Sequence, residues 1–262
     1  CERRRSSWKN ETELAAIRRE VEIAGEIQRR ILPSRFPVRQ GLDIFARTLQ
    51  ASEMGGDFFD VFELKDRRVG LVIADVSGKG IPAAFYMAVA RTLIQATALH
   101  EPSPSACLEQ VNRLLCRHDV PGMFVTVFYG VLDTESWEMT YANAGHPPPL
   151  VIDPISQREG LITALVGGEG TVLGIDEGQA YEEGSVGLNP GEGVYFFTDG
   201  LTEAFDFENN PFGDQRLWGC LSVHAGGSAS DLAGAVALAI KDFVGTAPQH
   251  DDITNLVIKR AV

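Results

Sequence analysis

Four aspartates in this 262-residue chain occupy the same kind of position, where an expected strand meets a loop. Asp57 opens an apolar segment after two glycines, Asp75 closes the run VGLVIAD, and Asp199 closes VYFFTD. Asp251, in HDDITNLVI, stands just before the last apolar segment. If these strand ends lie along one edge of the fold, the four carboxylates converge there.

Converging carboxylates repel one another, which raises their pKa values and costs stability unless a cation compensates. Oxygen-only ligands indicate magnesium or manganese rather than zinc. Two such ions sharing one carboxylate would hold a bridging hydroxide, a nucleophile for in-line attack on phosphorus. Any one of these motifs alone also fits a turn or a helix cap. Several glycines adjoin the acids and would let backbone carbonyls and water approach the ions; they are Gly55, Gly56, Gly78, Gly80 and Gly200.

The elements that must position these acids are mainly strands. Apolar segments bounded by turn residues predict strands at residues 42–49, 58–64, 69–74, 124–132, 137–142, 150–152, 194–198 and 253–259. Two helix pairs interrupt them, at 82–99 with 105–117 and at 215–223 with 229–244. Short gaps between successive strands favour antiparallel sheets, so the predicted class is an α+β layered sandwich rather than a Rossmann fold. Residues 166–179 are expected to form a flexible surface loop.

A helix is predicted over residues 11–31, ahead of this body. Its apolar stripe consists of Leu14, Ile17, Val21, Ala24, Gln28 and Ile31, and Ile23 and Ile27 lie off that stripe. The pattern fits a coiled-coil seam in which one side docks on the body and the other meets a partner helix, giving a homodimer through residues 11–31. It fits equally a single amphipathic helix packed on its own domain. We divide the chain into a coiled-coil-like linker, residues 1–40, and a body, residues 41–262.

Composition and charge limit the function classes. Apolar residues make up 44% of the chain and charged residues 23%, as in a soluble globular protein. The net charge is −13, with +4 over residues 1–40 and −17 over the rest, so the body repels nucleic acid and suits metal cations or a basic partner. No signal peptide or membrane span is evident, and the four cysteines show no CxxC spacing, which favours a cytoplasmic protein. The opening CERRRSSW suggests a piece of a longer protein whose upstream sensor is missing.

Five segments, in order, carry a family resemblance: SEMGGDFFDVF, ADVSGKGIPAAFYMA, NAGHPPPLV, YFFTDGLTEAFD and DDITNLVIK. Together they resemble the SpoIIE/RsbU-type branch of the metal-dependent Ser/Thr protein phosphatases, the PPM superfamily. The resemblance covers about residues 41–260, and IAGEIQRRILP resembles the linker helix that precedes such domains. It implies a four-layer α-β-β-α sandwich of two mainly antiparallel sheets.

The resemblance also implies a site and a reaction. Asp57 and Asp75 match the acids that bind a pair of Mn or Mg ions, Val76 matches a backbone-carbonyl ligand, and Asp199 and Asp251 complete the second site. Family members hydrolyse phosphoserine or phosphothreonine with metal-activated water and no covalent phosphoenzyme. Their substrate is commonly a STAS-domain anti-anti-sigma factor, which controls release of a sigma factor.

Two positions depart from the wider superfamily. The arginine that many members carry shortly before the first metal aspartate is absent from residues 51–54, and Ser77 stands where many carry a histidine. Phosphate capture and protonation of the leaving group therefore have no assigned residue. Lys79, Asn143 and His146 are the candidate substrate contacts, although the turn NAGHPPPL favours a structural role for His146.

Two further aspartates lie close to the predicted site residues. In an extended chain, the side chains of Asp60 and Asp252 point away from those of Asp57 and Asp251, so we expect Asp60 and Asp252 to support the structure. One rival is a non-catalytic phosphatase-like module that binds a STAS protein or another signalling partner. The second rival is a metal-dependent phosphomonoesterase that acts on small molecules.

Overall fold

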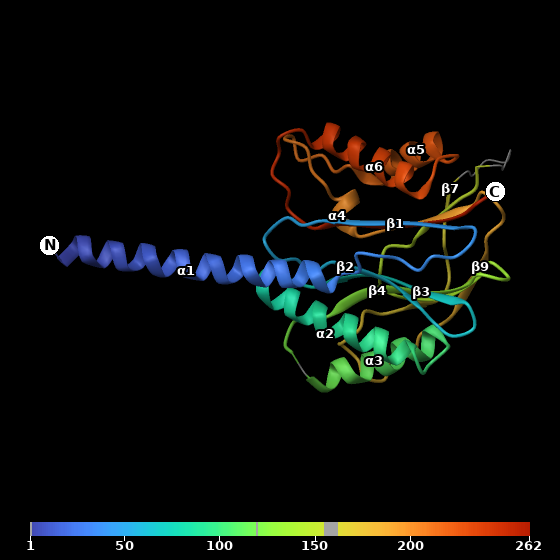
Figure 1. The fold of residues 1–262 in the computed structure, drawn as a ribbon, viewed down its shortest axis with the longest axis horizontal. Coiled ribbons are helices and arrows are strands. Elements are labelled where there is room, and N and C mark those ends of the chain that lie inside the picture. The colour runs from blue at the N-terminus through green and yellow to red at the C-terminus, as the bar shows by residue number, and fades with distance from the viewer. Residues whose placement is uncertain (1, 119, 155–161) are drawn as a thin grey trace.

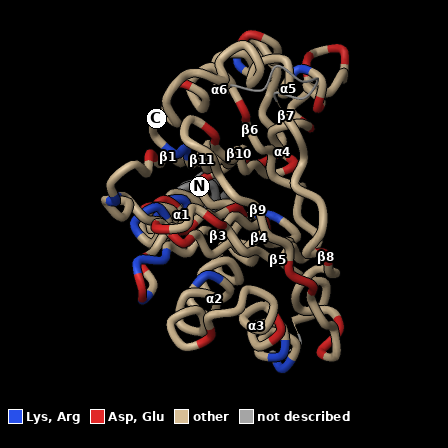
Figure 2. The backbone as a smooth tube through the Cα atoms, turned by 90° about the vertical axis from the view of Figure 1, so that its right-hand side faces the viewer, with Lys and Arg blue, Asp and Glu red and all other residues tan. Residues whose placement is uncertain are grey.

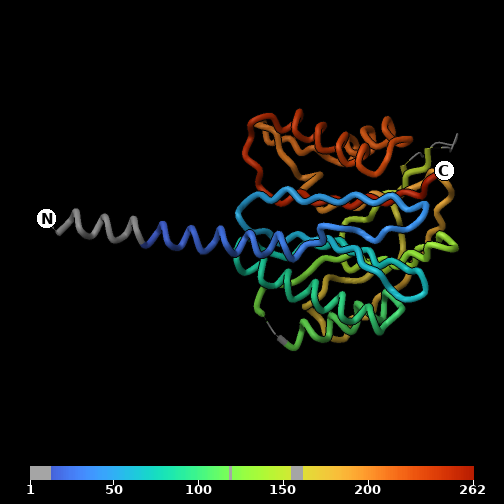
Figure 3. The backbone as a smooth tube through the Cα atoms, in the orientation of Figure 1, coloured from blue at the N-terminus to red at the C-terminus, as the bar shows by residue number. Residues whose placement is uncertain are grey.

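Two β-sheets lie face to face between two layers of helices in the computed structural model, which describes residues 2–118, 120–154 and 162–262 (Figures 1 and 2). The five-stranded sheet has the order β1 (Leu42–Leu49), β11 (Ile253–Arg260), β10 (Gly193–Phe197), β6 (Leu150–Ile152) and β7 (Ile162–Ala164), all antiparallel. The first strand of the body thus runs beside the last, as the blue and red tubes show (Figure 3).

The six-stranded sheet begins with β2 (Phe58–Glu63), β3 (Arg68–Val76), β4 (Val125–Asp133) and β5 (Glu138–Ala144), paired antiparallel in that order. Strand β5 then pairs in parallel with β8 (Glu169–Gly170) and antiparallel with β9 (Gly184–Gly187). Helices α2 (Gly80–Ala98) and α3 (Pro104–His118) cover this sheet, and α5 (Gly213–His224) and α6 (Ala229–Val244) cover the other (Figure 1). The predicted α-β-β-α sandwich is confirmed.

Three apolar clusters fill the spaces between these layers. In β2, alternate side chains face opposite ways: Phe58 and Phe62 join the cluster under α2 and α3, and Val61 joins the cluster between the sheets. A third cluster lies between the five-stranded sheet and α5 with α6. Because β2 and β3 are buried on both faces, their ends are held rigidly, which is what a site at those ends requires.

The predicted surface loop at 166–179 is wrong in part. It contains β8, and Leu173 is fully buried, exchanging backbone hydrogen bonds of 3.0 and 2.8 Å with Val125. The short strands β7, β8 and β9 were also missed. Each has two to four residues, and β8 and β9 contain glycine, so none has a strand pattern long enough to detect.

The N-terminal helix α1 (Glu2–Ile31) begins nine residues before the predicted start and projects away from the body (Figures 1 and 3). Within the part of α1 whose burial is described, residues 13–31, only the C-terminal end is buried against the rest of the chain. A Cβ atom at Gly25 would lie 2.3 Å from the Glu53 carbonyl oxygen, so the helix crosses the loop before β2 at a separation that only glycine permits. Across the described residues, no helix is long and apolar enough to traverse a bilayer.

Candidate active site

The four predicted aspartates come to one edge of the sandwich, two from each sheet. Asp57 directly precedes β2, and Asp75 is the last residue but one of β3. From the other sheet, Asp199 is the first residue of the short helix α4 (Asp199–Thr202), directly after Thr198 and β10, and Asp251 stands two residues before β11. The negative charges of Asp199 and Asp251 both act on Asp75, and that of Asp75 acts on Asp57, so the four carboxylates lie near one another.

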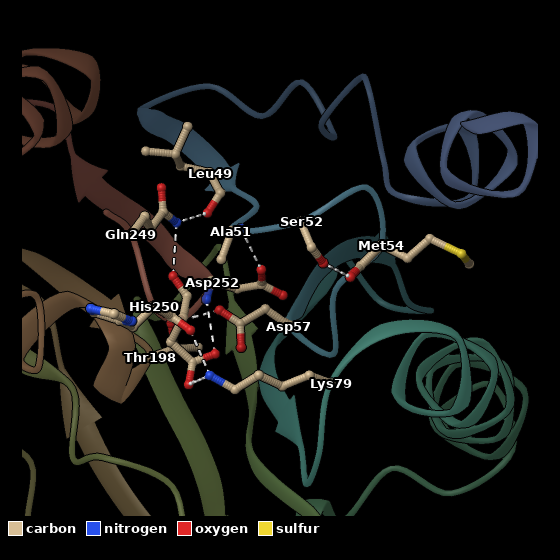
Figure 4. Close-up of polar contacts among 11 residues, drawn as sticks. Leu49, Ala51, Ser52, Met54, Asp57, Lys79, Thr198, Gln249, His250 and Asp252 are labelled. Atoms are coloured by element: carbon tan, nitrogen blue, oxygen red, sulfur yellow. Dashed lines mark hydrogen bonds and ion pairs between the residues drawn. The ribbon is translucent and has the colours of Figure 1, made fainter. Parts of the chain in front are cut away.

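Asp57 is the most enclosed of the four, with only 3% of the residue exposed. The Thr198 hydroxyl donates to its Oδ2 atom at 2.7 Å (Figure 4) and accepts a hydrogen bond from the Thr254 N–H at 3.1 Å. Burial, followed by the neighbouring Asp75 carboxylate, raises the pKa of Asp57 well above its ordinary value. This carboxylate is therefore fixed in place but lacks the positive charge that would favour its ionised form.

Asp75 and Asp199 are also buried near other carboxylates, and the pKa of each is raised. Burial and then the charge of Asp199 raise the pKa of Asp75 to about 7. Burial is also the main cause of the raised pKa of Asp199, and a hydrogen bond from the Gly200 N–H opposes it. Proton uptake or a bound cation would relieve the repulsion among these groups.

Lys79 supplies a positive charge at this edge. Its Nζ atom lies 3.0 Å from Oδ2 of Asp251 and donates to the His250 carbonyl oxygen at 2.5 Å (Figure 4). Both side chains of the ion pair are at least half exposed, so the pair is screened by solvent and contributes little stability. It nevertheless joins the loop after β3 to the loop before β11 across the two sheets.

Asp252 is closer to the site than its predicted outward orientation suggested. Its side chain is buried, accepts a 2.8 Å hydrogen bond from the Ala51 N–H, and has a pKa raised mainly by burial. A Cβ atom at Gly55 would stand only 1.8 Å from Asp252 Oδ2. Only glycine fits at position 55, because the Asp252 carboxylate approaches so closely. This contact ties the loop before β2 to the loop before β11.

Gly56 leaves room beside the predicted backbone ligand. A Cβ atom at Gly56 would lie 2.7 Å from the carbonyl oxygen of Val76, so only glycine keeps that oxygen accessible. Carboxylate and carbonyl oxygens are the donors that hard divalent cations prefer, so these residues fit Mn or Mg in chemistry. In the described part of the chain, no group of three or more acidic, histidine or cysteine side chains already stands in a metal-site arrangement.

A cavity of about 200 Å³ opens at this edge. Asp75, Asp251, Asp252 and Lys79 line it, together with the glycine loop before β2. Of the three candidate substrate contacts, only Lys79 belongs to this lining.

Asn143 and His146 instead hold a turn. The Asn143 side chain donates to the His146 carbonyl at 2.9 Å and accepts from the His146 N–H at 2.8 Å. The His146 ring is buried, its Nδ1 atom lies 2.9 Å from the Thr126 hydroxyl, and burial lowers its pKa to about 3. This is the structural role that the turn sequence favoured.

Sequence reasoning missed two polar residues that support the site. One is Thr198, described above. The other is Gln28 of α1, which is 3% exposed, donates to the Gly55 carbonyl at 2.5 Å and accepts from the Gly55 N–H at 3.2 Å. Its spacing places Gln28 in the predicted apolar stripe. A glutamine at a stripe position of an otherwise apolar seam is the signal that could have indicated a specific backbone contact.

Solved structures with the same fold define the class of this domain. The SiaA-PP2C domain of Pseudomonas aeruginosa matches 95% of this chain and 98% of its own length, with a TM-score of 0.81 and 25% identity. The RsbU and RsbW domains of Rv1364c from Mycobacterium tuberculosis match 87% of this chain and 63% of theirs, with a TM-score of 0.73 and 31% identity. The fold is therefore that of a PP2C-type phosphatase domain.

The chain belongs to the SpoIIE family, because the model of the family described as Stage II sporulation protein E (SpoIIE) matches residues 65–261. Among curated relatives, the phosphoserine phosphatase RsbU of Bacillus subtilis is 32% identical over 94% of this chain and 71% of its own length. Protein IcfG of Synechocystis is 27% identical over 93% of this chain, and this match spans 42% of IcfG. The predicted SpoIIE/RsbU-type branch is confirmed.

Proposed function

We propose that this chain is a protein phosphatase that hydrolyses a phosphoserine or phosphothreonine monoester on a regulatory protein. The observation that carries the proposal is the acidic edge, where aspartates from both sheets meet around a cavity and are short of positive charge. Membership of the SpoIIE family and the likeness to phosphoserine phosphatase RsbU support it. The small-molecule phosphomonoesterase is less favoured, because it has no such support.

The proposed ligands of two Mn or Mg ions are Asp57, Asp75, Asp199, Asp251 and the carbonyl of Val76. Such ions, when bound, polarise the phosphoryl group and lower the pKa of the attacking water. The chain's own contribution is positioning: Thr198 fixes one oxygen of Asp57, and Gly56 keeps the Val76 carbonyl accessible. The exposed ammonium group of Lys79 lines the same cavity and is the proposed contact for an incoming phosphate.

We infer that the substrate is a phosphorylated STAS-domain protein of the anti-anti-sigma type. Two relatives, RsbU and RsbP of B. subtilis, are named phosphoserine phosphatases, and the Rv1364c structure joins an RsbU domain to an RsbW domain. This chain spans only 54% of RsbP and 42% of IcfG, so the regulation of those longer proteins is a separate question.

The test is phosphate release from a phosphorylated STAS domain of the same genome, with p-nitrophenyl phosphate in parallel, each with and without Mn²⁺. We expect Mn²⁺-dependent release from both, with a much higher kcat/KM for the STAS protein. Activity on p-nitrophenyl phosphate alone would indicate the small-molecule phosphatase. Binding of the STAS domain without any phosphate release would indicate the non-catalytic module.

We also propose that residues 1–40 form a linker that dimerises through α1. Half-buried Val21, Ala24 and Ile31 turn towards the body. Leu14 and Ile17 continue that same side of the helix beyond the body, where they are 56% and 53% exposed, so the proposed partner contact lies on the docking side and not on the opposite side that the sequence suggested. Because Gln28 holds Gly55, two residues before Asp57, the position of α1 is coupled to the acidic edge.

A charge on the exposed part of this stripe should break the dimer. We expect Leu14→Glu to give a monomer with altered activity, measured by light scattering and phosphate release. Ile23→Glu, on another side of the same helix and equally exposed, is the matched control that should leave the dimer intact. If Leu14→Glu changed neither oligomeric state nor activity, the helix would not be a dimerising switch.

A further inference from the structure

A second hollow adjoins the acidic edge on the side of α6. It has a volume of about 210 Å³, against roughly 30 Å³ for one water molecule in the liquid, so it has room for a side chain. Its wall includes Gly200 of α4, the loop residues His250 and Asp251, and Ala237 and Ile240 of α6. The elements that carry Asp199 and Asp251 therefore form one wall of this hollow as well.

The hollow extends away from the acidic edge. A shallower depression of about 420 Å³ shares Leu49, Ala237, Ile240, Lys241 and Ile253 with it and continues between α6 and β1. We refer to the two together as the α6 groove. Leu49 is 46% exposed within the groove, and Leu238 is more exposed at its far end. The groove is thus an apolar strip that begins beside the proposed phosphate site.

The groove is physically joined to the acidic edge by Gln249. Its Nε2 atom donates to the Leu49 carbonyl at 2.8 Å and to the Asp251 carbonyl at 2.7 Å (Figure 4). One side chain therefore fixes the start of the groove relative to a proposed metal ligand. A ligand that binds at both places would meet a preformed spacing between them, which reduces the entropic cost of binding.

Charged side chains of both signs border the α6 groove, at different ends. Arg47 and Lys241 border it, and in the described part of the structure neither takes part in an ion pair. Glu203 and Asp251 border the hollow beside the acidic edge, so the basic end of the groove is the end between α6 and β1. An apolar strip bordered by free basic groups is complementary to an apolar side chain that has an acidic neighbour.

We propose that the α6 groove binds the segment of the substrate protein that flanks the phosphorylated residue, through one apolar side chain followed or preceded by an acidic one. The proposal rests on the proposed function, because the phosphate must occupy the acidic edge while the flanking segment occupies the groove. Binding energy from this remote contact would then orient the phosphoryl group for attack.

The test uses synthetic phosphoserine peptides. Each peptide has a background of serine and glycine around one phosphoserine and carries a single Leu-Glu pair. The pair is placed two, three, four or five residues before or after the phosphoserine. We expect one placement to raise kcat/KM about tenfold over the peptide without the pair, as loss or gain of a single buried anchor typically does. Ala237→Trp, which fills the groove from a half-exposed helix position, should abolish that preference. It should leave kcat/KM for p-nitrophenyl phosphate and for the plain peptide unchanged.

Two further variants keep the result interpretable. Ala235→Trp lies on the same helix but outside both hollows, so it should keep the preference. Lys241→Glu should shift the preference from Leu-Glu to Leu-Lys peptides without any large change in core volume.

Equal rates on all peptides, or a preference that survives Ala237→Trp, would overturn the proposal and leave the proposed phosphatase activity intact. If Ala237→Trp changed the oligomeric state instead, the groove would be an interface between copies of the chain, which also overturns the proposal. Failure on every substrate, including p-nitrophenyl phosphate, would show that the proposed phosphatase function itself is wrong, and the groove proposal would fail with it.

Discussion

Asp57 and Asp60 are three residues apart and almost equally buried, at 3% and 2% exposure, yet their surroundings are opposite. Asp60 faces α2, where the Arg91 guanidinium lies 2.8 Å from its Oδ2 atom and the Val61 N–H donates to Oδ1. Asp57 faces the edge between the sheets, where a threonine hydroxyl is its hydrogen-bond donor and Asp75 is a neighbouring like charge.

This difference separates a structural acid from a functional one. A buried carboxylate that only supports the fold is given a cation by the chain, as Asp60 is. A buried carboxylate that the chain fixes in place but leaves without a positive partner is destabilising by itself, and it persists where an external cation completes it. Burial raises the pKa of both groups, but only at Asp60 does an arginine oppose the shift.

The strongest way to break this comparison is to neutralise Asp57. We expect Asp57→Asn to lower kcat/KM about 1,000-fold, because a catalytic metal is worth several kcal/mol of transition-state stabilisation and 1.4 kcal/mol is a factor of ten. Without divalent metal, the variant should be at least as stable as the wild type, because an uncompensated buried charge is gone. Phosphate-release kinetics and urea unfolding in EDTA measure the two effects. An Asp57→Asn variant that retained full activity would eliminate the two-metal mechanism.

Removing the cationic partner of Asp60 should have the reverse outcome, a loss of stability with little change in activity. Arg91→Met leaves the Asp60 carboxylate buried without its partner, so we expect the free energy of unfolding to fall by about 3 kcal/mol. Activity per folded molecule should stay close to that of the wild type. The double variant with Asp60→Asn should recover at least half of the loss, because no charge is then left unpaired. If Arg91→Met instead abolished activity while leaving the protein folded, Asp60 would belong to the site.

The sequence was sufficient to place Asp57 and Asp60 on different faces, because residues three apart in a strand point in opposite directions. It also predicted the strands at whose ends the other three aspartates lie, since those strands carry uninterrupted apolar runs. The short, glycine-containing strands β8 and β9 were missed because two to four residues carry no usable alternation. Local pattern determines long elements but not the pairing of short ones.

Contacts between distant segments could not be predicted. Lys79 meets Asp251 across 172 positions of sequence, and Thr198 meets Asp57 across 141. Lys79 was predicted as a substrate contact, but nothing local indicated that its ammonium group would bind an acid of the same site. The outward orientation expected for Asp252 assumed extended chain, whereas the loop before β2 folds back over that carboxylate.

His146 extends the comparison to a group of the other charge sign, because burial lowers its pKa and keeps the ring neutral. Its pKa is about 3 in the folded protein, against an ordinary value of 6.5. The unfolded chain therefore binds the proton more readily, and stability falls as the pH drops below 6.5. At pH 5 the loss is about 2 kcal/mol, from 1.5 pH units at 1.36 kcal/mol each.

Urea unfolding at pH 7 and pH 5 tests this value. We expect His146→Gln to lose about 2 kcal/mol less than the wild type over that interval. The turn should survive the substitution, because Asn143 contacts only the backbone of residue 146. The acidic edge titrates in both proteins and cancels in the difference. Equal pH dependence of the two proteins would mean that His146 is protonated without penalty.

The smallest expected effect concerns Lys79, the cation that the chain does place at the acidic edge. Because Lys79 and Asp251 are both at least half exposed, their ion pair is worth well under 1 kcal/mol, in contrast to the buried Arg91 pair. Removing the ammonium group frees Asp251 and lessens repulsion of a divalent ion, so Lys79→Ala should bind Mn²⁺ about threefold more tightly by calorimetry. The gain should vanish in 0.5 M salt, where exposed charges are screened, whereas the stability cost of Arg91→Met should persist. Weaker Mn²⁺ binding by Lys79→Ala would mean that Lys79 organises the edge instead of competing for it, and the contrast between the two cations would then not hold.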